Sequence, residues 1–99
     1  MRLNMVAVGR RPPDWIRTGV DEFAQRMPRH LPLAVKAVNP GDARRSGDVD
    51  RARAQEADAL LAAAGSARLI ALDERGRSWR TPDLAEYLDA ALHEGRDLA

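Results

Sequence analysis

The chain has 99 residues, enough for one domain, and its 44% apolar and 31% charged residues are typical of a globular rather than a disordered protein. It contains no cysteine, which excludes disulfides and thiolate metal sites and fits a reducing, cytoplasmic location. The formal net charge of +1 gives no global signal for nucleic-acid binding, and no apolar run approaches the roughly 18 residues of a membrane span, so we expect no membrane partner.

The first part of the chain predicts two strands with a helix between them. Residues 3–8 and 33–38 are apolar, β-rich runs of the length of a strand. Residues 14–27 lie between them, and their apolar side chains recur at the spacing of one helix face. These side chains are Ile16, Val20, Phe23 and Met27.

A loop and a second helix follow. Residues 39–48 combine glycine, proline and side chains that bond their own backbone, which predicts a loop. Asp48 is a suitable N-cap for a helix that runs to Ala64, and Gly65 ends it. Within this helix, Glu56 either bonds a neighbouring loop or faces water.

The last part of the chain predicts a strand, a helix and the start of another strand. Residues 69–72 form a short apolar run, which indicates a buried strand. Thr81 is the expected N-cap of the next helix, with Pro82 at its first position, and Gly95 ends that helix. A further strand is expected to begin at Asp97.

Strands and helices therefore alternate along the chain. This order predicts a mostly parallel sheet with helices on both of its faces. We expect one three-layer α/β domain over residues 1–99.

Common catalytic and metal-binding patterns are missing. His30 and His93 lie far apart without a second ligand nearby, so we expect both to be solvated and no metal to be bound. The serines lack the glycines of a nucleophile elbow, and no glycine-rich phosphate loop is present.

The charged segment 73–80 has two interpretations. It is either a solvated turn or a ligand-binding rim, because ligands of open α/β sheets gather past the carboxyl ends of strands. Trp79 either stacks on an unpaired base or fastens the following helix to the sheet, and we favour the second role. Trp15, in the first helix, is expected in the core or in an interface.

This segment also carries a family resemblance. Leu72-Asp73, followed at fixed spacing by Gly76-Arg77 and a capped helix, resembles the central signature of the ribosomal RNA large subunit methyltransferase H family. That family is the small branch of the SPOUT methyltransferases. Further pieces match in the same order: residues 1–9, Pro13-Asp14-Trp15, Gln55-Glu56, residues 60–65 and Gly95-Arg96-Asp97.

The resemblance implies a SPOUT-type α/β fold and an S-adenosylmethionine-dependent enzyme that methylates N3 of a pseudouridine in large-subunit ribosomal RNA. It also implies a cytoplasmic homodimer that acts on the ribosome. In this family the strand end at Leu72 contributes to the S-adenosylmethionine pocket, and Asp73 is expected to add a polar contact to the nucleoside. The expected RNA contacts, which would neutralise phosphates, are Arg10, Arg11, Arg75 and Arg77.

The family's chain continues beyond the matching part, and its knotted C-terminal half has no counterpart in these 99 residues. We therefore expect an incomplete SPOUT-like domain without the knot, inactive on its own, and we assign no catalytic residue within residues 1–99. The alternative is a non-catalytic α/β fragment that binds RNA or a protein partner without turnover.

Overall fold

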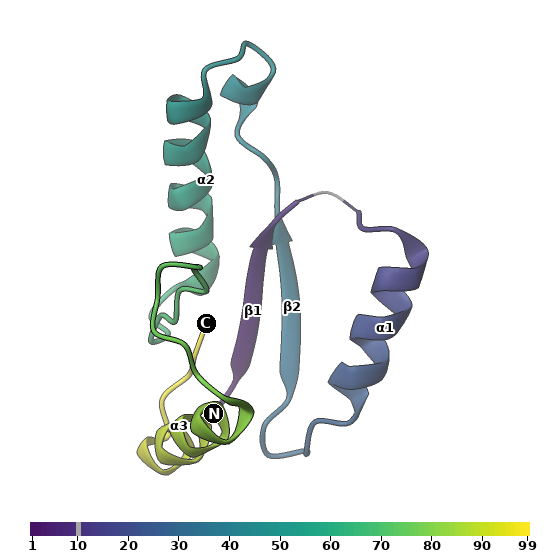
Figure 1. The fold of residues 1–99 in the computed structure, drawn as a ribbon, viewed down its shortest axis with the longest axis vertical. Coiled ribbons are helices and arrows are strands. Elements are labelled where there is room, and N and C mark those ends of the chain that lie inside the picture. The colour runs from purple at the N-terminus through teal and green to yellow at the C-terminus, as the bar shows by residue number, and fades with distance from the viewer. Residues whose placement is uncertain (10) are drawn as a thin grey trace.

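Two parallel strands form the centre of the computed structural model, which describes residues 1–9 and 11–99 (Figure 1). Strand β1 spans Leu3–Val8 and strand β2 spans Leu33–Val38. They pair in register from Leu3 opposite Leu33 to Val8 opposite Val38. Parallel strands need a crossover rather than a hairpin, and helix α1 (Asp14–Gln25) supplies it. The strands predicted at residues 3–8 and 33–38 are thus confirmed with their predicted limits.

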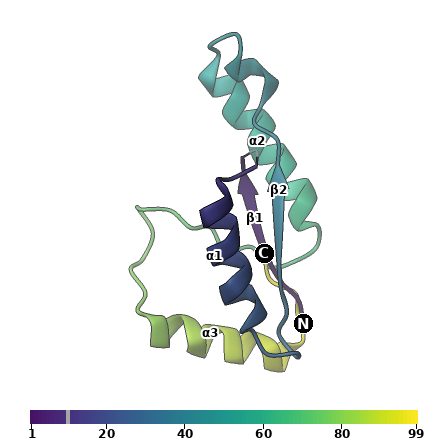
Figure 2. The same cartoon turned by 90° about the vertical axis from the view of Figure 1, so that its right-hand side faces the viewer.

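Helices lie on both faces of this sheet, as predicted. Helix α1 covers one face and helix α2 (Val49–Ala64) covers the other, as the two views in Figures 1 and 2 show. Helix α1 ends two residues earlier than predicted. The amide of Met27 bonds to the carbonyl of Ala24 in a tightened turn (3.1 Å), because the following Pro28 disfavours the helical conformation of the residue before it.

The apolar stripe of α1 is present, but it is not buried. The helix has no buried side chain, and Trp15 and Phe23 keep 77% and 67% of their surface exposed. Of the two places expected for Trp15, the core is therefore excluded, and an interface stays a prediction. An apolar groove separates α1 from the sheet, and Met5 and Leu33 line its strand side.

Helix α2 packs closely because its contact face is made of small residues. Ala52 is completely buried against the turn that precedes the short 3₁₀-helix η1 (Asp42–Arg44). A Cβ atom on Gly41 would lie 2.6 Å from the carbonyl oxygen of Ala52, so only glycine fits there. The predicted N-cap is confirmed, since the Asp48 carboxylate accepts from the Arg51 amide at 3.1 Å.

Glu56 fastens this turn to α2. Its carboxylate accepts from the Gly41 amide at 2.8 Å and from the Arg44 guanidinium at 2.5 and 2.6 Å. The Arg44 hydrogen bond, aided by the Gly41 amide, lowers the pKa of the buried Glu56 carboxyl to about 2. Of the two sequence interpretations of Glu56, the bond to a neighbouring loop is the one observed.

Residues 69–72 do not form the predicted strand. Residues 97–99 lie beside β1, as the yellow end of the chain in Figure 1 shows, and residues 68–70 pair with their other side. Amide-to-carbonyl bonds join Arg68 to Asp97 (2.9 Å) and Ile70 to Ala99 (2.8 Å). Leu72 follows these paired residues along the chain. The expected pairing near Asp97 is observed as isolated bridges at Leu98.

Helix α3 (Thr81–Glu94) closes the lower edge of the molecule in Figure 1. Its N-cap is Arg80 rather than the predicted Thr81, because the Asp83 carboxylate reaches back to the Arg80 amide at 2.9 Å. Gly95 ends the helix in the left-handed conformation (φ 71°), as predicted. Within the described part of the chain, no helix is long and apolar enough to cross a membrane.

Replacing Gly41 by alanine tests the close packing of α2. The added methyl group has no space beside Ala52, so we expect Gly41→Ala to lower the free energy of unfolding by about 1–3 kcal/mol in urea titrations. Gly19→Ala is the matched control. It adds the same methyl group to the interior of α1, where no atom lies within 4 Å, and is expected to stabilise by up to about 1 kcal/mol. Equal stability of Gly41→Ala and the wild type would contradict this packing.

The Glu56 interaction predicts a pH dependence. Its folded pKa is below its usual value of 4.5, so the interaction contributes fully above that value and is lost as the pH falls toward about 2. We expect Glu56→Gln to be less stable than the wild type near neutral pH and to lose less stability on acidification over this range. Glu22→Gln, which removes an exposed carboxylate paired with Arg26, is the control. Its loss of stability on acidification should match that of the wild type. If Glu56→Gln and the wild type lose the same free energy of unfolding as the pH falls, this role of Glu56 is contradicted.

Candidate functional site

A cavity of about 400 Å³ lies between residues 70–73, the charged loop and the first turn of α3. It begins at Ile70, at the end of the segment that pairs with residues 97–99, and strand ends are the place where α/β folds bind ligands. Its apolar lining comes from Ile70, Ala71, Leu72, Trp79 and Leu84. Its polar lining comes from Asp73, Arg77, Arg80 and Thr81.

A tight turn shapes the first part of the loop. The Asp73 carboxylate accepts from the Arg75 amide at 2.8 Å, and the Asp73 carbonyl accepts from the Gly76 amide at 3.0 Å. The Arg75 guanidinium closes the turn on the same carboxylate at 3.1 and 3.2 Å. This turn directs the chain from the sheet toward α3, so that the loop forms one side of the cavity.

The other end of the loop is held by α3. The Arg80 amide is capped by Asp83, and Trp79 precedes this cap and packs against Tyr87. The two ring centroids are 5.1 Å apart with an angle of 45° between the ring planes. Trp79 thus fastens the loop to α3 itself, a variant of the predicted role, while 39% of its surface remains exposed.

Both sequence-predicted cofactor residues line this cavity. Leu72 is 89% exposed, so its apolar side chain is available to a ligand and contributes little to folding. Asp73 lies next to it, with its carboxylate already bonded to Arg75. The structure brings these two residues together, and their contact with a cofactor stays a prediction.

The predicted RNA-binding arginines are distributed over two regions. Arg75 and Arg77 belong to the charged loop, whereas Arg11 is exposed in the connection between β1 and α1, across the sheet from that loop (Figure 1). Arg10 lies outside the described residues. Arg75 pairs with Asp73, but Arg77 has no ion-pair partner among residues 1–9 and 11–99, so it contributes an uncompensated positive charge to the cavity rim.

The site is equipped for binding rather than for proton transfer. The only carboxylate among its lining residues is that of Asp73, and the hydrogen bonds from Arg75 lower its pKa, which makes it a poor proton acceptor. Both histidines are exposed, as predicted. No cluster of potential metal ligands occurs in the described part of the chain.

Sequence reasoning missed part of the lining. Thr81, the predicted N-cap, and Leu84, three residues further along the helix, both line the cavity, and Leu84 is 41% exposed. Trp79 was interpreted mainly as a packing residue and proves to be both packed and cavity-lining. The available signal was the position of these residues in the first turn after a strand-end loop.

Comparisons with known proteins agree with the family resemblance. The family model described as "Predicted SPOUT methyltransferase" matches residues 1–99. "Ribosomal RNA large subunit methyltransferase H" of Methylococcus capsulatus is 43% identical to the chain over 100 residues. The match covers all of this chain and 64% of that protein, so the chain spans less than two thirds of the relative's length. Because the family model extends over the whole sequence, the chain belongs to the SPOUT methyltransferases.

Proposed function

We propose that the protein transfers a methyl group from S-adenosylmethionine to N3 of a pseudouridine in large-subunit ribosomal RNA. The observation that carries this proposal is the 43% identity, over the whole chain, to a relative named as a methyltransferase of that RNA. Membership of the SPOUT methyltransferases supports the reaction class. We further propose that the protein acts in the cytoplasm, on the ribosome, as a homodimer. The exposed apolar side chains of α1 support an association of this kind, because subunit interfaces bury such surface.

The residues of the cavity fit the methyl donor. Its volume of about 400 Å³ lies within the range of small-ligand pockets, and mostly apolar walls with few polar groups are typical of nucleoside sites. Leu72 would pack against the adenine ring, and Asp73 would contact the nucleoside from the rim. An exposed leucine gains favourable burial when such a ring covers it.

When bound, the donor supplies an electrophilic methyl group on a sulfonium. The contribution of this chain is to hold the nucleoside and limit the access of water, so that the methyl group and the target nitrogen meet at near-attack distance. N3 of pseudouridine must also lose a proton, and Asp73 is poorly suited to accept it because Arg75 stabilises its ionised form. We therefore assign donor binding, and no catalytic residue, to residues 1–99.

RNA would approach along the positively charged rim. Arg77 is the strongest candidate for a phosphate contact, because its charge is not balanced by a partner in the described ranges. Arg75 would contribute less, since it already pairs with Asp73. Arg10 and Arg11 would add contacts beyond β1.

Calorimetry with S-adenosylmethionine tests donor binding directly. It is performed on residues 1–99 and on the full-length protein, and we expect a micromolar dissociation constant for the full-length protein. Leu72→Asp places a charge against the adenine and is expected to weaken binding about tenfold or more. Leu61→Asp, at a leucine of α2 that is 55% exposed and outside the cavity, is the control and should bind like the wild type.

Activity is measured with large ribosomal subunits and labelled donor, followed by mass spectrometry of the methylated nucleoside. Label at N3 of pseudouridine supports the proposal. RNA binding with neither donor binding nor turnover in the full-length protein would refute it and favour the alternative, a non-catalytic RNA-binding module.

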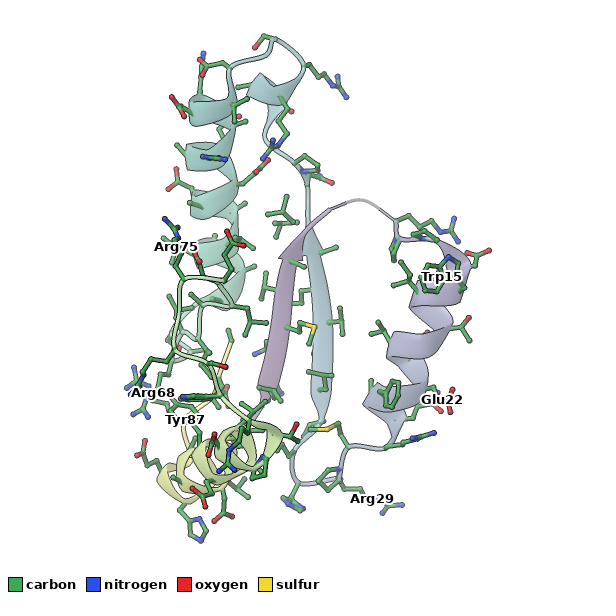
Figure 3. The ribbon with its side chains drawn as sticks, viewed as in Figure 1. Trp15, Glu22, Arg29, Arg68, Arg75 and Tyr87 are labelled. Atoms are coloured by element: carbon green, nitrogen blue, oxygen red, sulfur yellow. The ribbon has the colours of Figure 1, made fainter. Side chains whose placement is uncertain are left out.

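The salt dependence of RNA binding tests the role of Arg77. Each lost phosphate contact lowers the slope of log affinity against log salt by about 0.7–0.9, and we expect this change for Arg77→Gln. A smaller change is expected for Arg75→Gln, because Asp73 competes for that charge. Arg29→Gln removes the same charge from an exposed position near β2, far from Arg75 in Figure 3, and should leave the slope unchanged. Equal slopes for Arg77→Gln and Arg29→Gln would contradict this role.

A further inference from the structure

Trp79 both packs on α3 and lines the cavity. Its indole contacts Tyr87 with a centroid distance of 5.1 Å, yet 39% of the residue remains exposed and it lines the cavity. The indole therefore packs against α3 with part of its surface and borders the cavity with the rest. The exposed part of this ring is therefore available to whatever occupies the cavity.

The Tyr87 ring, on which the indole packs, lies among charged neighbours. Tyr87 lies beside Arg68, as Figure 3 shows, and the Tyr87 hydroxyl and the Glu94 carboxylate raise the pKa of the Arg68 guanidinium. Arg68 pairs with Glu94 at 2.8 Å, and its amide bonds to the carbonyl of Asp97 in the sheet. The indole is thus positioned by its contact with the Tyr87 ring of α3.

Leu72 provides an apolar side chain on the same cavity. It is almost fully exposed, so it has no protein partner to displace when a ligand enters. A flat aromatic ligand would be covered by an aliphatic side chain and by an indole. Base–aromatic stacking is tolerant of the base and typically changes affinity by about tenfold or more.

We propose that Trp79 is a ligand-binding residue that stacks on the nucleobase of the methyl donor. This inference rests on the proposed function, and it deepens it by naming the residue that recognises the adenine. The methyl donor and an RNA strand both present a planar nucleobase. The adenine of a small donor is favoured over an RNA base because the cavity, with Leu72 in its lining, has the volume of a small-ligand pocket directly past the sheet.

The chain contains two tryptophans, which makes each a spectroscopic control for the other. The emission that each of them contributes is measured as the difference between the wild type and the variant that lacks it, Trp15→Phe or Trp79→Phe. Trp15 is 77% exposed on α1 and does not line this cavity, so replacing it should not disturb the site. Full-length protein is titrated with S-adenosylhomocysteine, which carries the adenine without the reactive methyl group.

We expect saturable quenching of Trp79 emission with the dissociation constant found by calorimetry, and no change in Trp15 emission. Trp79→Leu should weaken binding about tenfold, whereas Trp79→Phe, which keeps an aromatic ring, should stay within about threefold of the wild type. Tyr87→Leu should weaken binding and Tyr87→Phe should not. Thermal unfolding of each variant confirms that it is folded under the assay conditions.

Three results would overturn the inference, and they differ from one another. If calorimetry shows binding but Trp79 emission does not respond and Trp79→Leu binds normally, the stacking assignment is wrong while the proposed function stands. If Trp79 responds to unstructured poly(U) RNA and not to S-adenosylhomocysteine, the ring stacks on RNA instead. If calorimetry detects no donor binding by the wild type, the proposed function fails and this inference fails with it.

Discussion

The burial of Leu98 is the constraint on which the candidate site depends. This side chain is completely buried, and its backbone bonds to β1 through the Asn4 amide (2.9 Å) and the Arg2 carbonyl (2.9 Å). Residues 97–99 thereby become the neighbour of β1 and offer their other side to residues 68–70. Backbone bonds to residues 97–99 thus hold residues 68–70 in place. The cavity opens immediately past this pairing.

Beyond the ladder, the shape of the loop is set by backbone hydrogen bonds more than by its many charges. The ion pairs of Arg75 with Asp73 and of Arg80 with Asp83 are exposed, and pairs of this kind contribute little in salt solution. The same carboxylates, however, also accept backbone amides, which defines the turn at one end and the helix cap at the other. The loop is consequently fixed at both ends, and Arg77 lies between them without a balancing charge in the described chain.

The parts of the fold that the sequence predicts well depend on local patterns. Strands β1 and β2 have continuous β-rich runs, and α2 has a capping Asp48 and a terminal Gly65. Residues 69–72 fail as a regular strand because their run predicts an apolar segment and not its pairing, which is limited to isolated bonds between residues 68–70 and residues 97–99. The apolar stripe of α1 stays unburied because periodicity shows which face of a helix is apolar and not how closely the helix approaches the sheet.

In the candidate site, too, local sequence patterns predict some residues, and contacts between distant parts of the chain decide the others. Leu72 was identified because the family resemblance concerns a short, contiguous signature, and the structure places it on the cavity. The double role of Trp79 could not be predicted from such a signature. It depends on a contact with Tyr87 in α3 and on the cavity that the indole also lines. The proposed methyl transfer requires both binding of the donor and removal of the proton from N3 of the pseudouridine. Under the proposed function, the described residues offer apolar walls and an aromatic ring for donor binding and one unbalanced positive charge for RNA, whereas the only lining carboxylate is committed to Arg75 and is poorly suited to accept a proton.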